Sequence, residues 1–275
     1  MNLSILQNGS DIRGIALTGV PGEEPNLTQK ETGLLTKGFL LWLTEKAGKT
    51  PDQLKVAIGR DPRLSGKLLM QTAVNTLGQY GVEVLDCGIA STPAMFMSTR
   101  FPQYDCDGAI MLTASHLPYN RNGFKYFSKE GGLDKEDIRQ IIEYAEKDTP
   151  RLGEPTHEHT AIRQVGVLVY PSTPCDLMDT YSAHLRSIIV DGLKNSNLQS
   201  PDGDDARPLE GLKIVVNAGN GSGGFYATDV LKPLGADISA SRYLEPDGGF
   251  PHHAPTPEDP EAITSTEMAV IRNGA

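Results

Sequence analysis

Short apolar runs alternate with helical patterns along the first half of the chain, and this alternation constrains the fold more than any other feature. The runs have the length and content of buried strands, and they lie at 55–58, 82–85 and 109–112. Segments with helical periodicity surround them at 28–47, 65–80 and 134–145, with a short helix expected from Thr92 and a further strand at 124–128. Thr28 and Glu31 form a capping-box pattern, and Ser65 is a candidate cap for a helix whose apolar side includes Leu68 and Leu69. An alternating order of this kind predicts a largely parallel sheet with helices on both faces.

A second alternating region follows a polar stretch at 148–165. Helices are expected at 175–190 and 225–234, strands at 212–216 and 236–240, and a closing helix that ends at Gly274. We therefore expect an α/β chain of two three-layer α/β/α domains with mixed, mostly parallel sheets. Domain I spans 1–150, a linker spans 151–170, and domain II spans 171–275. Because no strand follows the closing helix, domain II is expected to be truncated at its C-terminus.

Charge and cysteine content narrow the classes of partner. The formal charge of −10 argues against nucleic acid and anionic membrane surfaces, although local arginines could still bind a small anion. No apolar run approaches the ~18 residues of a spanning helix. Cys87, Cys106 and Cys175 lie far apart without a CxxC pair, which predicts reduced thiols and a cytoplasmic setting.

Ser115 is the residue that most strongly suggests chemistry. It follows the third predicted strand, and open α/β sheets bind ligands at the carboxyl ends of their strands. A serine there is either a nucleophile or a helix cap. Its neighbours favour the nucleophile: His116 is adjacent, Lys125 follows a glycine-containing loop, and Arg13 and Arg60 lie in glycine-flanked turns. Phosphoryl transfer depends on positioning and on cationic stabilisation, which these residue types supply.

Four motifs occur in one order along the chain. Residues 113–125 read TASHLPYNRNGFK, and they are accompanied by GSDIRG at 9–14, GRDPRLSG at 59–66 and GFPHHAPTPE at 249–258. Together they closely resemble the phosphoserine loop and three companion loops of the α-D-phosphohexomutases, the phosphoglucomutase/phosphomannomutase superfamily. Two positions depart from the usual pattern, since Leu117 and Thr256 each stand where the family commonly has Asn.

The resemblance implies roles for these residues. Ser115 would be the phosphorylated nucleophile, and its phosphate would be a ligand of Mg²⁺. Arg13 would face the phosphate and Arg60 would belong to its environment, while His116 and Lys125 would act as general acid/base or charge-stabilising groups. The family interconverts 1-phospho and 6-phospho hexoses through a bisphosphate, so the implied partners are a hexose phosphate and a hexose bisphosphate.

The resemblance also implies parts that we expect beyond Ala275: an aspartate metal loop, and domains III and IV of the same chain. The stretch 202–207, DGDDAR, is similar to a metal loop, but Ala206 replaces its third aspartate and we expect a solvated loop. We therefore expect little or no mutase activity from this segment alone. The alternatives are a non-catalytic phosphosugar-binding or regulatory protein, and a phosphoserine-using sugar phosphatase. The hexose and the oligomeric state stay open, and a plastid is the alternative compartment.

Overall fold

The computed structural model divides into two units, which are described separately. The first comprises Met1–Ala114 and Tyr119–Cys175, and the second comprises Ser115–Pro118 and Asp176–Ala275. The described residues are 2–147, 152, 162–164, 167–195 and 207–275. Most of the linker expected at 151–170 and nearly all of the DGDDAR stretch therefore lie outside them. No helix in these ranges is long and apolar enough to cross a bilayer.

A mixed sheet forms the centre of the first unit, in the strand order β1-β2-β6-β5-β3-β4-β10, with β7 paired to β6. Its strands are β1 (Gln7–Asn8), β2 (Asp11–Ile15), β3 (Lys55–Arg60), β4 (Glu83–Ile89), β5 (Gly108–Leu112), β6 (Arg121–Ser128), β7 (Gly131–Gly132) and β10 (Thr173–Pro174). The pairs β3–β5, β3–β4 and β4–β10 are parallel, whereas β2–β6 and β5–β6 are antiparallel. A separate hairpin joins β8 (Ile162–Gln164) to β9 (Val167–Val169). The three strands predicted from apolar runs thus form the parallel centre of the sheet.

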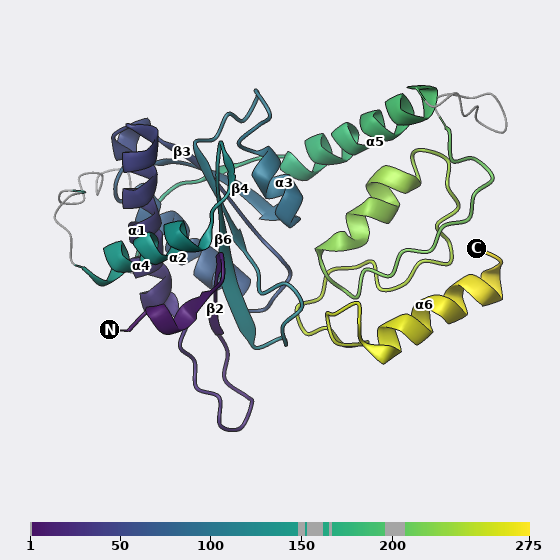
Figure 1. Ribbon diagram of the computed structural model, residues 1–275, viewed down its shortest axis with the longest axis horizontal. Coiled ribbons are helices and arrows are strands. Elements are labelled where there is room, and N and C mark those ends of the chain that lie inside the picture. Colours follow the sequence, from purple (N-terminus) through teal and green to yellow (C-terminus); the bar gives the residue numbers. More distant parts are fainter. Residues whose placement is uncertain (1, 148–151, 153–161, 165–166, 196–206) are drawn as a thin grey trace. The chain divides into compact units, whose positions relative to one another are not determined.

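Helices cover both faces of this sheet. Figure 1 shows α1, α2 and α4 on one side of it and α3 on the other. Their bounds are α1 (Gln29–Ala47), α2 (Gly66–Gly78), α3 (Thr92–Met97) and α4 (Lys135–Glu146). This arrangement confirms the three-layer α/β/α architecture expected for the first domain.

Helix α1 begins and ends at the signals in its sequence. The Thr28 hydroxyl accepts a hydrogen bond from the Lys30 N–H, and the Glu31 carboxylate accepts one from the Thr28 N–H. These bonds satisfy amides that have no partner inside the helix. The helix ends at Gly48, whose φ of 64° is the left-handed conformation that glycine adopts without steric cost.

Alternation along β6 separates the core from a polar face. Phe124 and Tyr126 stack on one another, and Tyr126 stacks on Phe39 of α1 at a centroid distance of 4.6 Å. All three rings are at most 1% exposed. Successive side chains of a strand point to opposite faces, so Lys125, between the two rings, lies on the side away from α1. Packing of the aromatic residues therefore also fixes the direction of this lysine.

The start of α2 differs from the prediction. Ser65 does not cap the helix with its side chain; its Oγ instead accepts a hydrogen bond from Asn122 Nδ2 at 2.9 Å. Leu68 is 56% exposed, while Leu69 is buried. Leu69 and Ala73 are four residues apart and share the buried face, whereas Leu68 lies about 100° around the helix from Leu69.

A buried ion pair joins the ends of three strands. Asp61 follows β3, and its N–H donates to the Leu112 carbonyl at the end of β5. Its carboxylate accepts from Arg63 Nε at 3.0 Å and from Thr113 Oγ1 at 2.7 Å. Arg63, whose side chain is fully buried, also donates from Nη1 to the Arg121 carbonyl at the start of β6. We call Asp61, Arg63 and Thr113 the brace, because together they tie β3, β5 and β6.

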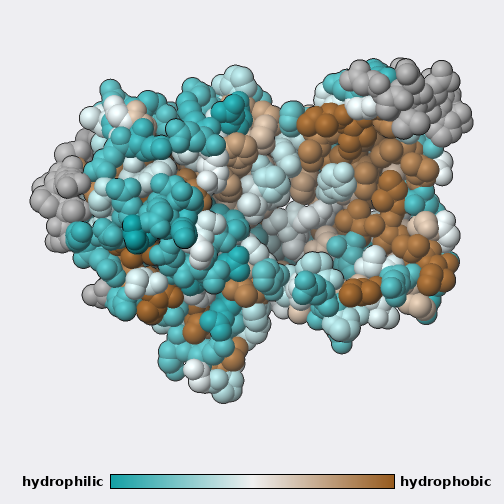
Figure 2. Space-filling view, viewed as in Figure 1, coloured by the Kyte–Doolittle hydropathy of each residue, from teal (hydrophilic) through white to brown (hydrophobic). Residues whose placement is uncertain are grey.

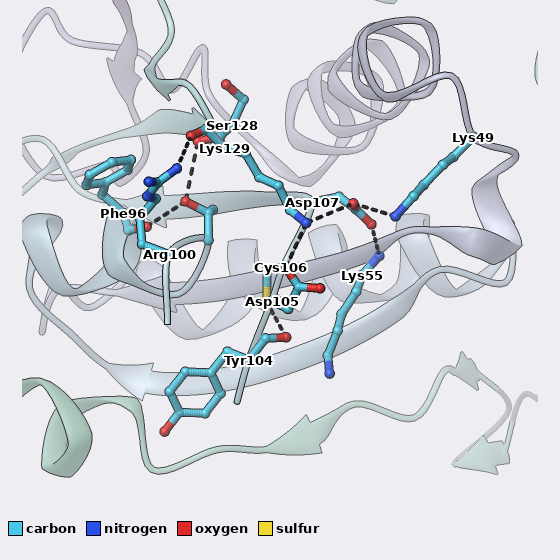
Figure 3. A network of polar contacts seen from close by, with 11 residues as sticks. Lys49, Lys55, Phe96, Arg100, Tyr104, Asp105, Cys106, Asp107, Ser128 and Lys129 are labelled. Atoms are coloured by element: carbon cyan, nitrogen blue, oxygen red, sulfur yellow. Dashed lines mark hydrogen bonds and ion pairs between the residues drawn. The ribbon is translucent and has the colours of Figure 1, made fainter. Parts of the chain in front are cut away.

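A second buried carboxylate, Asp107, connects the opposite ends of the same three strands (Figure 3). The Asp107 carboxylate, at the start of β5, accepts from Lys49 Nζ at 2.6 Å and from the Lys55 N–H at 3.1 Å. Lys129 Nζ lies 3.8 Å from the same carboxylate. Since Lys55 opens β3 and Lys129 follows β6, one carboxylate aligns the near ends of three strands.

The second unit contains helices but little regular strand. Its elements are α5 (Leu177–Asn195), a 3-10 turn (Ser222–Gly224), a π-helical segment (Tyr226–Leu231) and α6 (Pro260–Asn273). The strands predicted at 212–216 and 236–240 appear among the described residues only as isolated parallel bridges, Lys213 with Asp237 and Asn217 with Arg242. The ladder is interrupted because Ser241 lies in a turn and its Oγ, not a backbone carbonyl, accepts the Val216 N–H.

Apolar side chains are exposed on the second unit, as the brown surface at the right of Figure 2 shows. The exposed large apolar residues of this unit are Ile188, Leu212, Tyr226, Ile263, Met268 and Ile271. They come from α5, the π-helical segment, α6 and the chain before the first bridge.

The contact between α1 and α4 predicts opposite effects for two glycine substitutions in one helix. A Cβ on Gly38 would lie 2.3 Å from the Ile141 carbonyl oxygen, whereas a Cβ on Gly33 would meet nothing closer than Thr76 Oγ1 at 3.6 Å. Gly38→Ala should therefore lower the free energy of unfolding by about 2 kcal/mol. Gly33→Ala should raise it by about 0.5–1 kcal/mol, because alanine restricts the unfolded chain. Urea denaturation of both variants measures this, and equal effects would contradict the close packing at Gly38.

The brace predicts a large cost for removing its cation. Arg63→Met should lower the free energy of unfolding by about 3 kcal/mol, because Asp61 is left buried with an unpaired charge. Arg139→Met is the matched control, since Arg139 is exposed and pairs with Glu136 on the surface of α4. Its effect should stay within about 0.5 kcal/mol in the same denaturation experiment. A loss at Arg63 no larger than that at Arg139 would refute the structural role of the pair.

Candidate functional site

Four strands bring polar residues to one level of the sheet. Arg60 of β3 pairs in register with Leu112 of β5, and the Thr113 N–H donates to the Gly123 carbonyl of β6. Gly123 in turn pairs with Arg13 of β2. The carboxyl ends of β3 and β5 therefore lie level with Arg13 on the neighbouring antiparallel strands, at the edge where sheets of this type bind ligands.

Asp11 links two of the cations at this end of the strands, Arg13 and Lys125. Its Oδ2 lies 2.5 Å from Lys125 Nζ and 3.0 Å from Arg13 Nη2. The Asp11 side chain is 11% exposed, and those of Lys125 and Arg13 are 23% and 16% exposed. A partly buried carboxylate shared by two cations leaves the cluster with a net positive charge, which suits an anionic ligand.

Glycine at position 123 permits this close arrangement. A Cβ on Gly123 would lie 2.1 Å from the Ile12 carbonyl oxygen and 2.9 Å from that of Thr113. Any side chain would therefore push β2 and β5 away from β6. The preceding residue, Asn122, is fully buried; its Oδ1 accepts from the Gly123 N–H and its Nδ2 donates to Ser65.

The brace lies beside this cluster and is electrostatically costly to bury. Burial raises the pKa of the Asp61 carboxyl, and the charge of Arg63 and the hydrogen bonds from Thr113 and Arg63 oppose this rise. Burial likewise lowers the pKa of the Arg63 guanidinium, against the opposing effect of Asp61. The donors around Asp61 all point at its two oxygens, which is the arrangement that stabilises an ionised carboxylate.

Ser115 lies in an exposed turn two residues after Thr113. Its φ of 54° is left-handed, a conformation that is uncommon for residues other than glycine. His116 is exposed as well. Such a conformation persists only where the surrounding structure holds it in place, and residues of this kind are common at functional sites. Residues 115–118 belong to the second unit, whereas Arg13, Arg60 and Lys125 belong to the first.

The structure thus brings together three of the site residues that the sequence predicts, Arg13, Arg60 and Lys125, and it adds Asp11. Arg13 and Lys125 meet at Asp11, and Arg60 lies on the same sheet edge, with its Nη1 donating to the Asp61 carbonyl. Asp11 had no role in the sequence analysis. The available signal was its place in the GSDIRG motif, two residues from Arg13 and therefore on the same face of a strand.

The second unit contains a cluster of amide and imidazole groups. The Asn220 Oδ1 lies 2.7 Å from His252 Nδ1, and the ring of His252 stacks on Tyr243 at a centroid distance of 4.0 Å. The Asn217 Oδ1 lies 3.2 Å from His253 Nε2. The glycine-rich turn at 217–224 thus packs against the motif at 249–258.

A metal ion finds few ligands among these residues. In the parts of the chain that the structure describes, no three His, Cys, Asp or Glu side chains are grouped so that they could hold an ion. A phosphate on Ser115 would offer oxygen ligands of the type that Mg²⁺ prefers.

Family comparison connects these features. Residues 4–151 match the model "Phosphoglucomutase/phosphomannomutase, alpha/beta/alpha domain I", and residues 190–275 match the model of domain II. A phosphoglucomutase from Neisseria meningitidis is 30% identical over 265 residues, which cover 96% of this chain and 47% of that protein. A phosphoglucosamine mutase from Thermobifida fusca is 33% identical over 193 residues, covering 70% of this chain and 36% of that protein.

Solved structures agree on the fold. A phosphoglucomutase/phosphomannomutase family protein from Burkholderia thailandensis superimposes with a TM-score of 0.69 at 24% identity, covering 97% of this chain and 49% of that one. The chain spans about half the length of this structure, and less than half the length of the curated relatives named above. With both domain models matched and the α/β/α fold in common, this chain belongs to the phosphoglucomutase/phosphomannomutase family.

Proposed function

We propose that this chain supplies the phosphoserine half of a hexose-phosphate mutase, with Ser115 as the residue that carries the phosphoryl group. The observation that supports this most is the exposed, left-handed Ser115, which follows β5 after Thr113 and Ala114, together with the Arg13–Asp11–Lys125 cluster at the level where β5 ends. Family membership adds that proteins similar to this chain are named as mutases of glucose, mannose and glucosamine phosphates.

In the proposed transfer, the Ser115 Oγ forms a bond to phosphorus as the bond from phosphorus to a hexose bisphosphate oxygen breaks. The serine proton passes to a base, for which His116 and Lys125 are the candidates, the released sugar oxygen takes up a proton, and the sugar leaves as a monophosphate. The phosphoserine then gives its phosphoryl group to the free hydroxyl of a hexose 1-phosphate, the resulting bisphosphate reorients, and transfer of its other phosphoryl group back to Ser115 leaves a hexose 6-phosphate. Arg13 and Arg60 would stabilise the charge on the equatorial oxygens, which is the main requirement of this chemistry.

Mg²⁺ is the proposed cofactor, and it would neutralise charge on the transferring phosphoryl group. Phosphate oxygens on Ser115 are the proposed ligands from this chain, since no three His, Cys, Asp or Glu side chains among the described residues are grouped so that they could hold an ion. For this reason we propose that the 275-residue chain does not sustain mutase turnover by itself. An aspartate metal loop of the kind that the resemblance implies is the proposed source of the remaining ligands, and domains III and IV of a full-length protein are proposed partners of this chain. Cytosol, with a plastid as the alternative, stays a prediction.

Labelling tests the role of Ser115. The chain, incubated with Mg²⁺ and glucose 1,6-bisphosphate carrying radioactive phosphate, should gain label on the peptide that contains Ser115. Ser115→Ala should abolish this label, because alanine has no hydroxyl to accept the group. Ser4→Ala is the matched control, since Ser4 is exposed at the N-terminus, and it should label like the unmodified chain.

The same experiment separates the alternatives. A non-catalytic phosphosugar-binding protein would bind the sugar without gaining label at any residue. A sugar phosphatase would release inorganic phosphate in proportion to its turnover and would need no bisphosphate. Label that persists in Ser115→Ala would refute the proposed nucleophile. Sustained conversion of glucose 1-phosphate to glucose 6-phosphate by the 275-residue chain would refute its proposed inactivity.

Asp11 is a positioning residue in this proposal. Asp11→Asn should slow phosphorylation of Ser115 by roughly 10²-fold, because Arg13 and Lys125 lose the charge that fixes them relative to one another. The rate of label incorporation measures this, and circular dichroism checks that the fold is retained. Asp52→Asn, which changes an exposed carboxylate in the turn before β3, is the control and should leave the rate unchanged. An unaltered rate in Asp11→Asn would remove Asp11 from the site.

A further inference from the structure

The fold brings together two of the three cysteines that are distant in the sequence. The Sγ atoms of Cys87 and Cys175 lie 3.1 Å apart, although 88 positions separate the residues. Neither of the two sulfurs is in a disulfide bond in the structure. The third cysteine, Cys106, is buried and its Sγ contacts the Tyr104 carbonyl at 3.8 Å. The close pair takes no part in the proposed phosphoryl chemistry.

The backbone places these two thiols in the geometry of a disulfide. Strand β10 runs parallel to β4, with Pro174 opposite Asp86, and the Cys175 N–H continues the ladder by donating to the Asp86 carbonyl at 2.9 Å. The next step of this register sets Cys175 beside Cys87. Neighbouring strands are about 4.8 Å apart, which is inside the Cα separation that a disulfide spans. The sulfurs need to approach by only about 1 Å to reach bonding distance.

The two thiols differ in exposure, and this difference determines which of them reacts first. Cys175 is partly exposed, whereas Cys87 is 6% exposed. The hydrogen bond with Cys175 and burial raise the pKa of the Cys87 thiol, so it stays protonated until its partner reacts. An oxidant in solution therefore meets Cys175 first, and Cys87 is the resolving thiol beneath it.

We propose that Cys87 and Cys175 form a reversible disulfide by exchange with a low-molecular-weight disulfide of the glutathione class. The Cys175 thiolate attacks one sulfur of the small disulfide, forms a mixed disulfide and releases one thiol. Cys87 then loses its proton, attacks the Cys175 sulfur and releases the second thiol. The protein gives up two electrons and two protons, and the small disulfide takes up both. Excess reduced thiol reverses each step.

The disulfide would fasten β10, the two-residue strand that directly precedes the boundary between the two units. Cys175 is the last residue of the first unit, and Asp176 begins the second, with α5 starting at Leu177. Strand β10 contains only two residues, so few hydrogen bonds hold it to β4. A disulfide fastens this strand covalently and closes the loop from residue 87 to residue 175. Closing a loop of that length restricts the unfolded chain and stabilises the folded one.

Peptide mapping of the whole 275-residue chain tests the proposal directly. After incubation with oxidised glutathione, digestion without reduction should yield one cross-linked peptide pair containing Cys87 and Cys175, and dithiothreitol should release it. Recovery of Cys175 bound to glutathione, with Cys87 still a free thiol, would overturn the proposal. A cross-link that involves Cys106 would overturn it as well. This measurement needs no variant, so it does not depend on the folding of any mutant.

Variants supply the matched comparison. Oxidation should raise the melting temperature of the unmodified chain by several degrees. Cys175→Ala and Cys87→Ala should each lose this shift, whereas Cys106→Ala should keep it, because Cys106 is equally buried but unpaired with either thiol in the ladder. A shift retained in Cys175→Ala would show that the stabilisation comes from another reaction and would refute the assignment.

Discussion

The buried pair of Asp61 and Arg63 is the interaction on which the rest of the first unit depends. The pair follows β3 and connects it to two other strand ends: Asp61 reaches β5 through Leu112 and Thr113, and Arg63 reaches β6 through the Arg121 carbonyl. Buried charges are expensive unless every donor and acceptor is matched, and here several hydrogen bonds and the opposite charge of each partner oppose the desolvation of both groups. The result is a rigid sheet edge, on which Arg13, Arg60 and Lys125 occupy defined positions.

The same backbone organises both the core and the polar edge. In β6, the residues on one face fill the space beneath α1, and Lys125 on the other face meets Asp11 of the adjacent strand. Gly123 lets β2 and β5 approach from both sides. A change in the packing of Phe124 and Tyr126 would therefore shift Lys125 within the cationic cluster, although neither ring belongs to that cluster. The reason is that register and side-chain direction are coupled in a strand.

Sequence reasoning succeeded where local pattern and tertiary structure agree. The apolar runs at β3, β4 and β5, the capping box at Thr28 and the family motifs all carry strong local signals. It failed where a distant partner competes for a side chain. Ser65 is a residue type that commonly caps helices, yet its hydroxyl accepts a hydrogen bond from Asn122 instead. The pattern at 212–216 is that of a strand, yet the Ser241 hydroxyl accepts the Val216 N–H and interrupts the strand pairing. The position of Asp11 beside Lys125, and that of Cys87 beside Cys175, depend on which strands pair with one another. The sequence of a single segment does not contain that information.

The left-handed backbone at Ser115 restricts which amino acids this position can accept over evolutionary time. Threonine has the same hydroxyl chemistry, but branching at Cβ makes a φ near 54° a severe outlier for it. Glycine would adopt the turn freely and would lack the oxygen. In the proposed role, two demands, a hydroxyl and tolerance of that dihedral angle, are met together by serine, so the shape of the turn would restrict the residue at this position as strictly as the proposed reaction.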